Sequence, residues 1–89
     1  MSTAFEYEAR IIAEKQKGNE LPTFETIIKG IITKDDLEHK TEDIVYETGV
    51  IIGLPKDHSL EEKIAHVLLK FEKNGIVVRG HKRGYWRKK

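Results

Sequence analysis

The sequence contains no cysteine, only two prolines, and no uninterrupted apolar run longer than three residues. The absence of cysteine excludes a disulfide scaffold and fits a reducing compartment. Runs as short as Val50-Ile51-Ile52 cannot cross a membrane, and the first residues lack the basic and apolar pattern of a secretory signal. We therefore expect a cytoplasmic protein that does not enter a membrane and holds its fold by apolar packing.

The chain has 89 residues, of which 35% are charged and 38% are hydrophobic, as is typical of one small soluble domain. It shows no internal repeat and no low-complexity segment. We expect a single domain over residues 1–89, made of an added N-terminal helix (1–20), a main body (23–87) and a basic tail (88–89).

Positive and negative charges are distributed unevenly along the chain. Residues 1–62 contain seven Lys or Arg and fourteen Asp or Glu, a net charge of −7. Residues 63–89 contain nine Lys or Arg and one Glu, a net charge of +8. This asymmetry is typical of a chain that binds a polyanion with one end.

Residues 59–74 predict an amphipathic helix. Ser59 and Glu62 have the spacing of a capping box, and Asn74-Gly75 is a helix stop because glycine adopts the left-handed conformation without steric cost. We expect a helix from about Leu60 to Asn74. Its buried stripe recurs at steps of three and four residues: Leu60, Ile64, Val67, Leu68 and Phe71.

The residues after this helix predict a two-stranded hairpin with a basic tip. Ile76-Val77-Val78 is β-branched and Tyr85-Trp86 is aromatic, and both segments favour strands on either side of a charged, glycine-containing turn. We expect residues near Val77 to pair antiparallel with residues near Trp86.

The N-terminal third predicts two further helices. The first runs from Thr3 to about Lys17, and its core-facing residues are expected to be Phe5, Ala9, Ile12 and Ala13. The second runs from Phe24 to Lys29 with Thr23 as its cap, and its candidate core residues are Phe24, Ile27, Ile28 and Ile31. We expect residues 30–33 to be extended, because Gly30 weakens a helix and the following residues are β-branched.

Helical spacing returns between residues 34 and 52, at Leu37, Ile44, Val45, Thr48 and Ile52. The pattern allows one long helix from Lys34, with Thr33 as its cap, or two helices of which the second is capped by Thr41. Gly49 and Gly53-Leu54-Pro55 are expected to end this segment in stages.

The expected order of helix, short strand, helix, helix and hairpin resembles the winged helix-turn-helix superfamily. The resemblance covers about residues 23–87, and residues 1–20 form an added helix. It is carried by Ile31 to Leu37 and by the C-terminal residues Ile64, Leu68, Phe71, Asn74-Gly75-Ile76-Val77 and Arg83-Gly84-Tyr85-Trp86. The last of these are similar to the recognition helix and wing of small prokaryotic transcription regulators. The resemblance implies an α+β fold and DNA binding, in which the start of the recognition helix enters the major groove.

The basic residues of the C-terminal third form the candidate nucleic-acid interface. A helix stripe of Lys63, His66, Lys70 and Lys73 lies roughly opposite the apolar one, since each residue turns about 100°. The expected contacts to phosphate groups from the helix and the wing are Lys63, His66, Lys70, Lys73, Arg79, His81, Lys82, Arg83 and Arg87. The alternative is that these charges only solvate a helix face and a hairpin.

Tyr85 and Trp86 allow two interpretations. Alternation along a strand places one ring in the core and the other outside, where it could stack on a base or a partner. Alternatively, both rings pack around the base of the wing.

The sequence does not favour catalysis or metal binding. Glu62–His66 and Asp35–His39 have a spacing that suits a metal, but neither pair has a visible third ligand. There is no glycine-rich phosphate loop and no cysteine nucleophile. We expect a protein without enzymatic activity, cofactor or metal.

The sequence thus predicts a small transcriptional regulator or accessory factor that binds double-stranded DNA. The alternative is a winged-helix module that binds another protein, and the acidic start of the last helix, from Asp57 to Glu62, would support this if it faced the same side as the wing. Apolar residues at Phe5, Ile12 and Val50–Ile52 can belong to the core or to an interface, so we also expect a homodimer.

Overall fold

A computed structural model describes residues 3–89 and has four helices and three strands within that range. Their bounds in chain order are α1 (Ala4–Gln16), α2 (Phe24–Thr33), β1 (His39–Lys40), α3 (Thr41–Ile52), α4 (His58–Lys73), β2 (Val77–Arg79) and β3 (Tyr85–Lys88). The strands form one antiparallel sheet in the order β1-β3-β2. The predicted α+β class is confirmed.

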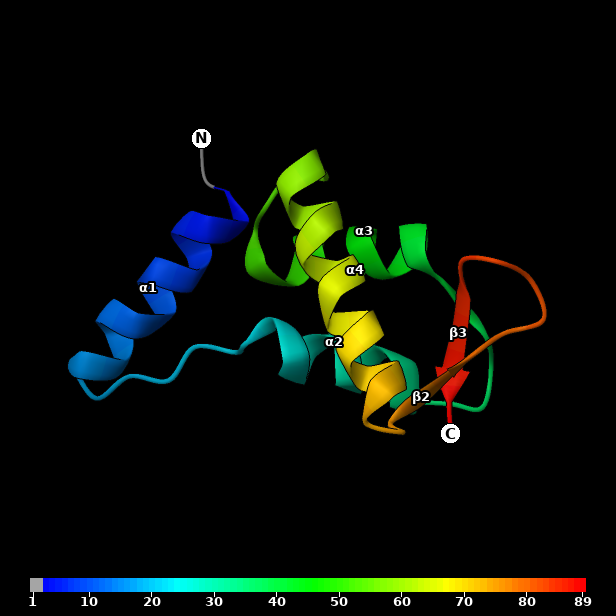
Figure 1. Ribbon diagram of the computed structural model, residues 1–89. Coiled ribbons are helices and arrows are strands. Elements are labelled where there is room, and N and C mark those ends of the chain that lie inside the picture. The colour runs from blue at the N-terminus through cyan, green and yellow to red at the C-terminus, as the bar shows by residue number, and fades with distance from the viewer. Residues whose placement is uncertain (1–2) are drawn as a thin grey trace.

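The helices α2, α3 and α4 form the body of the molecule, with the sheet at one end and α1 at the other (Figure 1). The molecule measures 42 × 24 × 20 Å along its principal axes. The core lies where the three helices meet the sheet, and its fully buried apolar side chains are Ile28, Ile32, Ile44, Val45, Leu60, Ile64, Leu68 and Val77. None of the helices described between residues 3 and 89 has the length and apolar content that a membrane crossing requires.

Helix α4 buries its predicted stripe, since all five apolar residues of that stripe are in the core. Its predicted stop is also confirmed, because Gly75 has a left-handed φ of 75°. The predicted cap is wrong. Asp57 Oδ1 accepts the backbone N–H of Leu60 at 3.0 Å, and Ser59 donates its hydroxyl to the same oxygen at 2.9 Å. A carboxylate is the stronger acceptor, so the helix begins at His58, with Asp57 as its N-cap.

Helix α2 begins as predicted, with the Thr23 hydroxyl accepting the N–H of Thr26 at 3.1 Å. All four predicted core residues of this helix are buried. The prediction that residues 30–33 are extended is wrong, because α2 continues through Gly30 to Thr33. Ile31 and Ile32 complete the apolar face that packs between α3 and α4, and this packing outweighs their weak helix propensity.

The segment between α2 and α3 differs from both predicted alternatives. Residues 34–38 are not helical, so Thr33 caps no helix, and Leu37 is exposed. A strand, β1, follows at residues 39–40, where His39 pairs with Trp86. A single helix, α3, then runs from Thr41 to Ile52.

Thr41 is the first residue of α3 and joins that helix to the hairpin. Its N–H and its hydroxyl donate to the carbonyl oxygen of Gly84 at 2.8 and 2.9 Å, and its hydroxyl oxygen accepts the Trp86 indole N–H at 2.8 Å. The prediction that Thr41 caps the helix is therefore wrong, because its hydroxyl is engaged by the hairpin.

Gly49 lies inside α3 and does not end it. A Cβ at this position would sit 2.7 Å from the carbonyl oxygen of Leu54, so the returning chain requires glycine here. Helix α3 ends at Gly53, which has a left-handed φ of 73°.

The predicted hairpin is confirmed. Strands β2 and β3 are antiparallel, and Arg79 lies opposite Trp86 in their register. Trp86 is buried, whereas Tyr85 on the opposite face is half-buried and its ring centroid lies 5.6 Å from that of His81. The two rings therefore lie on opposite faces of β3, as strand alternation predicted, and stacking of Tyr85 on a base or a partner stays a prediction. Strand β3 includes Lys88, and the N–H of Lys89 donates to the carbonyl oxygen of Ile76 at 3.2 Å. Residues 88–89 therefore continue the hairpin, and the prediction that they form a basic tail is wrong.

Helix α1 has nearly its predicted length, with Thr3 accepting the N–H of Glu6 at 3.2 Å as its cap. The prediction of its buried face is wrong. Ala4 and Tyr7 are buried, whereas all four expected core residues, Phe5, Ala9, Ile12 and Ala13, are exposed. The rings of Tyr7 and Phe24 pack edge to face, with their centroids 5.4 Å apart, and the Tyr7 hydroxyl donates to the carbonyl oxygen of Pro22 at 2.7 Å. Helix α1 therefore packs on the body through the face that carries Ala4 and Tyr7.

Candidate nucleic-acid interface

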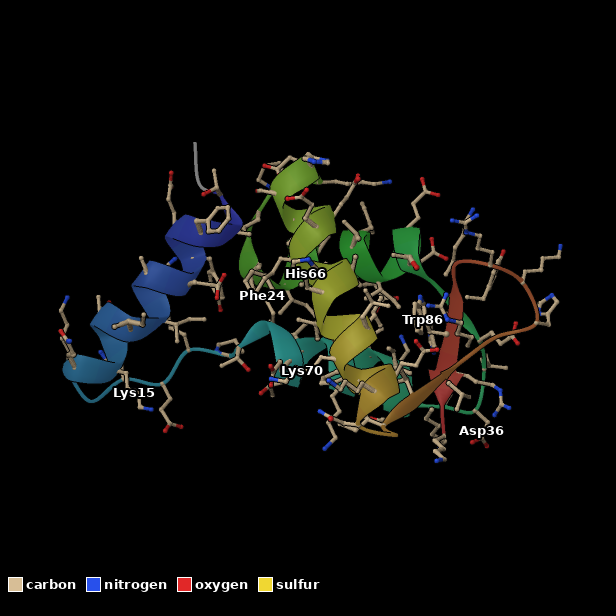
Figure 2. All side chains as sticks on the ribbon, in the orientation of Figure 1. Lys15, Phe24, Asp36, His66, Lys70 and Trp86 are labelled. Carbon is tan, nitrogen blue, oxygen red and sulfur yellow. The ribbon has the colours of Figure 1, made fainter. Side chains whose placement is uncertain are left out.

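The basic stripe predicted on α4 is partly neutralised by carboxylates of α1 and α2. Lys63 Nζ lies 3.0 Å from a carboxylate oxygen of Glu8 on α1, and Lys70 Nζ lies 2.7 Å from Glu25 on α2. His66 and Lys73 are exposed, and Figure 2 shows His66 on the outer side of α4. Exposed ion pairs contribute only about 0–1 kcal/mol, so a phosphate could compete for these lysines, but the neighbouring carboxylates reduce the local positive potential.

Two of the predicted contact residues in the hairpin are engaged within the chain. The Arg79 guanidinium lies 2.8 Å from Glu72 on α4 and 4.9 Å from the centre of the Trp86 ring. The His81 ring bonds the carboxylate of Glu38, which also accepts the backbone N–H of His81 at 2.8 Å. These contacts fix the two sides of the hairpin to the body.

Glu38 holds the tip of the hairpin, a role that the sequence did not reveal. The backbone N–H of His81, and then its ring, lower the pKa of Glu38 below its ordinary value. A Cβ on the adjacent Gly80 would lie 2.7 Å from the Glu38 carboxyl carbon and 2.8 Å from the Tyr85 Cβ, so this close approach requires glycine. Only the pairing of β1 with β3 brings Glu38 to the tip, and no local sequence signal indicates that pairing.

Within residues 73–89, a second group of basic residues has no carboxylate within ion-pair distance in the part of the chain that the structure describes. We call these the unpaired cations, and all of them are exposed: Lys73, Lys82, Arg83, Arg87 and Lys89. Lys82 and Arg83 form the hairpin tip, and Arg87 lies opposite Val78, on the other face of β3 from the buried Trp86. Lys88, which the prediction omitted along with Lys89, lies 3.0 Å from Asp36.

The acidic start of α4 lies on the same side as one end of the hairpin turn. Glu61 and Ala65 line a hollow of about 460 Å³ together with Thr41 and Val45 of α3 and Gly84 of the turn. Lys40 and Lys56 at the rim both contact Glu42, at 3.4 and 2.9 Å, and Lys56 contributes most to lowering the pKa of that carboxyl. This side of the molecule therefore presents mixed charge.

The two histidine pairs considered as metal ligands differ in the structure. His39 Nε2 lies 2.9 Å from Asp35, whereas Glu62 contacts His58 at 3.1 Å instead of His66. Within residues 3–89, no three His, Asp or Glu side chains come together in a way that could hold a metal ion.

Comparison of the chain with protein-family models, curated proteins and solved structures finds no match.

Proposed function

We propose that the protein is a non-catalytic winged-helix factor that binds double-stranded DNA through its hairpin and the end of α4. The role would be that of a small transcriptional regulator or accessory factor. The winged-helix assignment is supported by the order of elements from α2 onward, which is helix, short strand, helix, helix and hairpin. It is also supported by β3 lying between β1 and β2, which packs the hairpin beside the helices.

The unpaired cations are the observation that most supports this proposal. Five exposed basic groups remain uncompensated on residues 73–89, although the same chain uses acids elsewhere to neutralise Lys63, Lys70 and Arg79. Phosphate contacts made by such groups release counterions, which is the main source of non-specific affinity for nucleic acid. The hairpin is therefore expected to make the principal contact.

The start of α4 does not support insertion of that helix end into a groove. Asp57 is the cap, and the following Glu61 and Glu62 are exposed. Phosphates would repel this acidic turn. The proposal accordingly places the contact at the C-terminal end of α4 and along the hairpin.

The experiment is a salt titration of binding to a random-sequence duplex, comparing wild type with the double variant Lys82→Ala/Arg83→Ala. If each residue neutralises one phosphate, the log–log slope should fall by about 0.9 per residue removed, or about 1.8 for the double variant. Lys15→Ala, on the distant α1, is the matched control and should leave the slope unchanged.

The helix lysines provide an internal comparison in the same titration. The sequence alone predicted that Lys63→Ala and Lys70→Ala would act like the hairpin variants. Because each lysine already faces a carboxylate, we now expect each substitution to lower the slope by less than about 0.5, roughly half of a full phosphate contact. A folded wild-type protein with no duplex affinity at about 0.01 M salt, where attraction is strongest, would refute DNA binding.

A second candidate function is a winged-helix module that binds another protein. It is favoured by the acidic start of α4 on the side of the Gly84 turn and by three exposed apolar residues of α3: Tyr46, Val50 and Ile51. In that case the unpaired cations would meet an acidic protein surface. Absence of duplex binding together with retention of an acidic protein partner would favour this alternative.

A further inference from the structure

Helix α1 carries an apolar face that the rest of the chain does not cover. We call Phe5, Ala9, Ile12 and Ala13 the α1 stripe, and all four are exposed. Phe5 is 73% exposed and Ile12 is 62% exposed, and exposed large apolar groups at helical spacing are characteristic of a contact surface. The stripe is therefore a candidate contact surface.

The stripe cannot be buried by rotating α1 on its own body. The opposite face is anchored by Tyr7, whose ring packs on Phe24 and whose hydroxyl donates to Pro22, and by the ion pair between Glu8 and Lys63. At about 100° per residue, the stripe points nearly opposite to Tyr7. Turning the stripe inward would expose Tyr7 and break these contacts.

The charges that flank the stripe change sign along the helix. Because each residue turns about 100°, Glu6 and Lys17 flank the stripe on one side, and Glu8 and Lys15 flank it on the other. These two acids lie in the N-terminal half and these two lysines lie at the C-terminal end, whereas Arg10 and Glu14 lie further round the helix, toward the face that carries Tyr7. An identical helix running in the opposite direction would place Glu6 beside Lys17 and Glu8 beside Lys15, whereas a parallel copy would bring like charges together.

We propose that a second copy of this chain covers the α1 stripe, with the two α1 helices packed antiparallel. The two-fold axis lies between Ala9 and Ile12, so that Ala9 of one copy packs against Ile12 of the other. The small side chain of Ala9 leaves room for Ile12 and lets the helices approach. The antiparallel arrangement also opposes the two helix dipoles.

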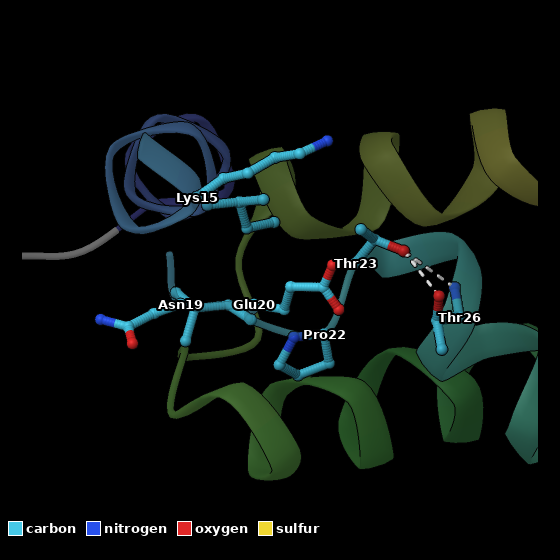
Figure 3. A pocket seen from close by; sticks show the side chains of 8 residues that line it. Lys15, Asn19, Glu20, Pro22, Thr23 and Thr26 are labelled. Atoms are coloured by element: carbon cyan, nitrogen blue, oxygen red, sulfur yellow. Dashed lines mark hydrogen bonds between the residues drawn. The ribbon is translucent and has the colours of Figure 1, made fainter. Parts of the chain in front are cut away.

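The remaining charges around α1 are compatible with this pairing. Lys15 extends over a hollow of about 360 Å³ that is lined by α1, by residues 19–22 and by the start of α2 (Figure 3). No carboxylate among residues 3–89 lies within ion-pair distance of its ammonium group. Glu8 contacts Lys63 at 3.0 Å through one oxygen, and a carboxylate can accept from two donors. Lys17 lies 3.8 Å from Glu14 in an exposed contact that is easily exchanged.

The exposed apolar residues of α3 fit a second copy less well. Tyr46, Val50 and Ile51 share that helix with Glu42, Asp43 and Glu47, and α3 contains no lysine or arginine. Two copies of this surface would bring like charges together. Self-association through α1 is therefore favoured by charge, and α3 provides a matched control surface.

The size of α1 sets the expected affinity. A helix of 13 residues is about 20 Å long, and its face covers less than the roughly 800 Å² per partner of a standard interface. The dimer is accordingly weak, and we expect it to form at concentrations on the order of 100 µM. At the lower concentrations of a DNA titration the protein is monomeric, so this inference and the proposed DNA binding can fail independently.

Sedimentation equilibrium tests whether the α1 stripe forms a dimer interface. The protein concentration would run from about 20 to 500 µM, a range that includes the expected dissociation constant. Wild type should shift from monomer to dimer, Ile12→Glu should remain monomeric, and Val50→Glu on α3 should dimerise like wild type. If thermal melting shows that Ile12→Glu disturbs the fold, the truncation Ile12→Ala replaces it and should weaken the dimer. Monomeric wild type over the whole range, or loss of the dimer in Val50→Glu alone, would overturn the proposal.

Charge reversal tests the antiparallel orientation. Lys15→Glu/Lys17→Glu makes both halves of α1 acidic, and Glu6→Lys/Glu8→Lys makes both halves basic. Each variant alone should be monomeric, whereas an equimolar mixture should form a heterodimer at least as stable as the wild-type dimer. Dimerisation of either variant alone as strongly as wild type, or a mixture that stays monomeric, would contradict the proposed pairing.

Discussion

Helix α4 and the hairpin that follows it use their charged side chains in different ways. In α4, Lys63 and Lys70 face Glu8 and Glu25, and Asp57 caps the first turn. In the hairpin, Lys82, Arg83 and Arg87 have no carboxylate within ion-pair distance among residues 3–89. The two segments also differ in composition, since α4 contains three lysines and three glutamates, whereas residues 77–89 contain six Lys or Arg and no Asp or Glu. Lys73, the last residue of α4, likewise has no carboxylate within ion-pair distance among residues 3–89, so the unpaired positive charge lies at the end of α4 and in the hairpin.

The comparison shows that net charge along a chain is a weak guide to a binding surface. The +8 excess of residues 63–89 includes lysines whose charge is balanced by acids far away in sequence. What matters for a phosphate is the potential at the surface after folding. On this basis we propose a mainly structural role for α4 and a mainly binding role for the hairpin, and each proposed role predicts a different response to substitution.

The largest expected effect is on stability, from Leu68→Ala in α4. Leu68 is fully buried, and removal of a buried leucine side chain costs about 2–5 kcal/mol because it leaves a cavity. Leu69→Ala, one residue later on the same helix and 48% exposed, should change the free energy of unfolding by no more than about 0.5 kcal/mol. Denaturant unfolding of both variants checks this, and equal effects would contradict the assigned face of α4.

A smaller effect is expected from the cap of α4, and it depends on pH. The N–H of Leu60, followed by the hydroxyl of Ser59, lowers the pKa of Asp57 below its ordinary value. A lowered folded-state pKa contributes stability that is present above the unfolded value, about 4, and is lost as the pH falls through the folded-state pKa. Asp57→Asn keeps the acceptor but removes this titration.

Thermal melting of wild type and Asp57→Asn between about pH 7 and pH 2 measures the contribution of the cap. Wild type should melt at a higher temperature than Asp57→Asn at neutral pH, and the gap should close as the pH falls through the folded-state pKa of Asp57. Other carboxyls with lowered pKa, such as Glu38 and Glu42, titrate equally in both proteins. A gap that stays constant with pH would contradict a charged cap.

Periodicity predicted α4 and α2 because these helices bury the apolar residues that the pattern identifies, and the hairpin followed from strand propensity on either side of a glycine-containing turn. It failed in α1 for a physical reason. Helix α1 has apolar residues on two faces, and periodicity does not say which of them meets the body. The choice is made by Tyr7, whose ring and hydroxyl both find partners more than ten residues away.

Several other errors came from contacts that are distant in sequence. Residues 30–33 are helical because Ile31 and Ile32 are packed between α3 and α4, against their local preference. Thr41 cannot cap α3 because Gly84 and Trp86 engage it from the hairpin. The candidate site was predicted as a set of basic residues, but their division into paired and unpaired groups depends on Glu8, Glu25, Glu38 and Glu72, which only the fold brings close.

The most direct test of the account is to map a bound duplex on the protein by amide chemical shifts. ¹⁵N-labelled wild-type protein would be titrated with a short random-sequence duplex at low salt, where phosphate attraction is strongest. We predict the largest shifts at Lys73 and along residues 79–89, with little change at residues 57–62 and in α1. Shifts concentrated at residues 57–62, or no shifts at all under these conditions, would contradict the assignment of the hairpin as the nucleic-acid interface.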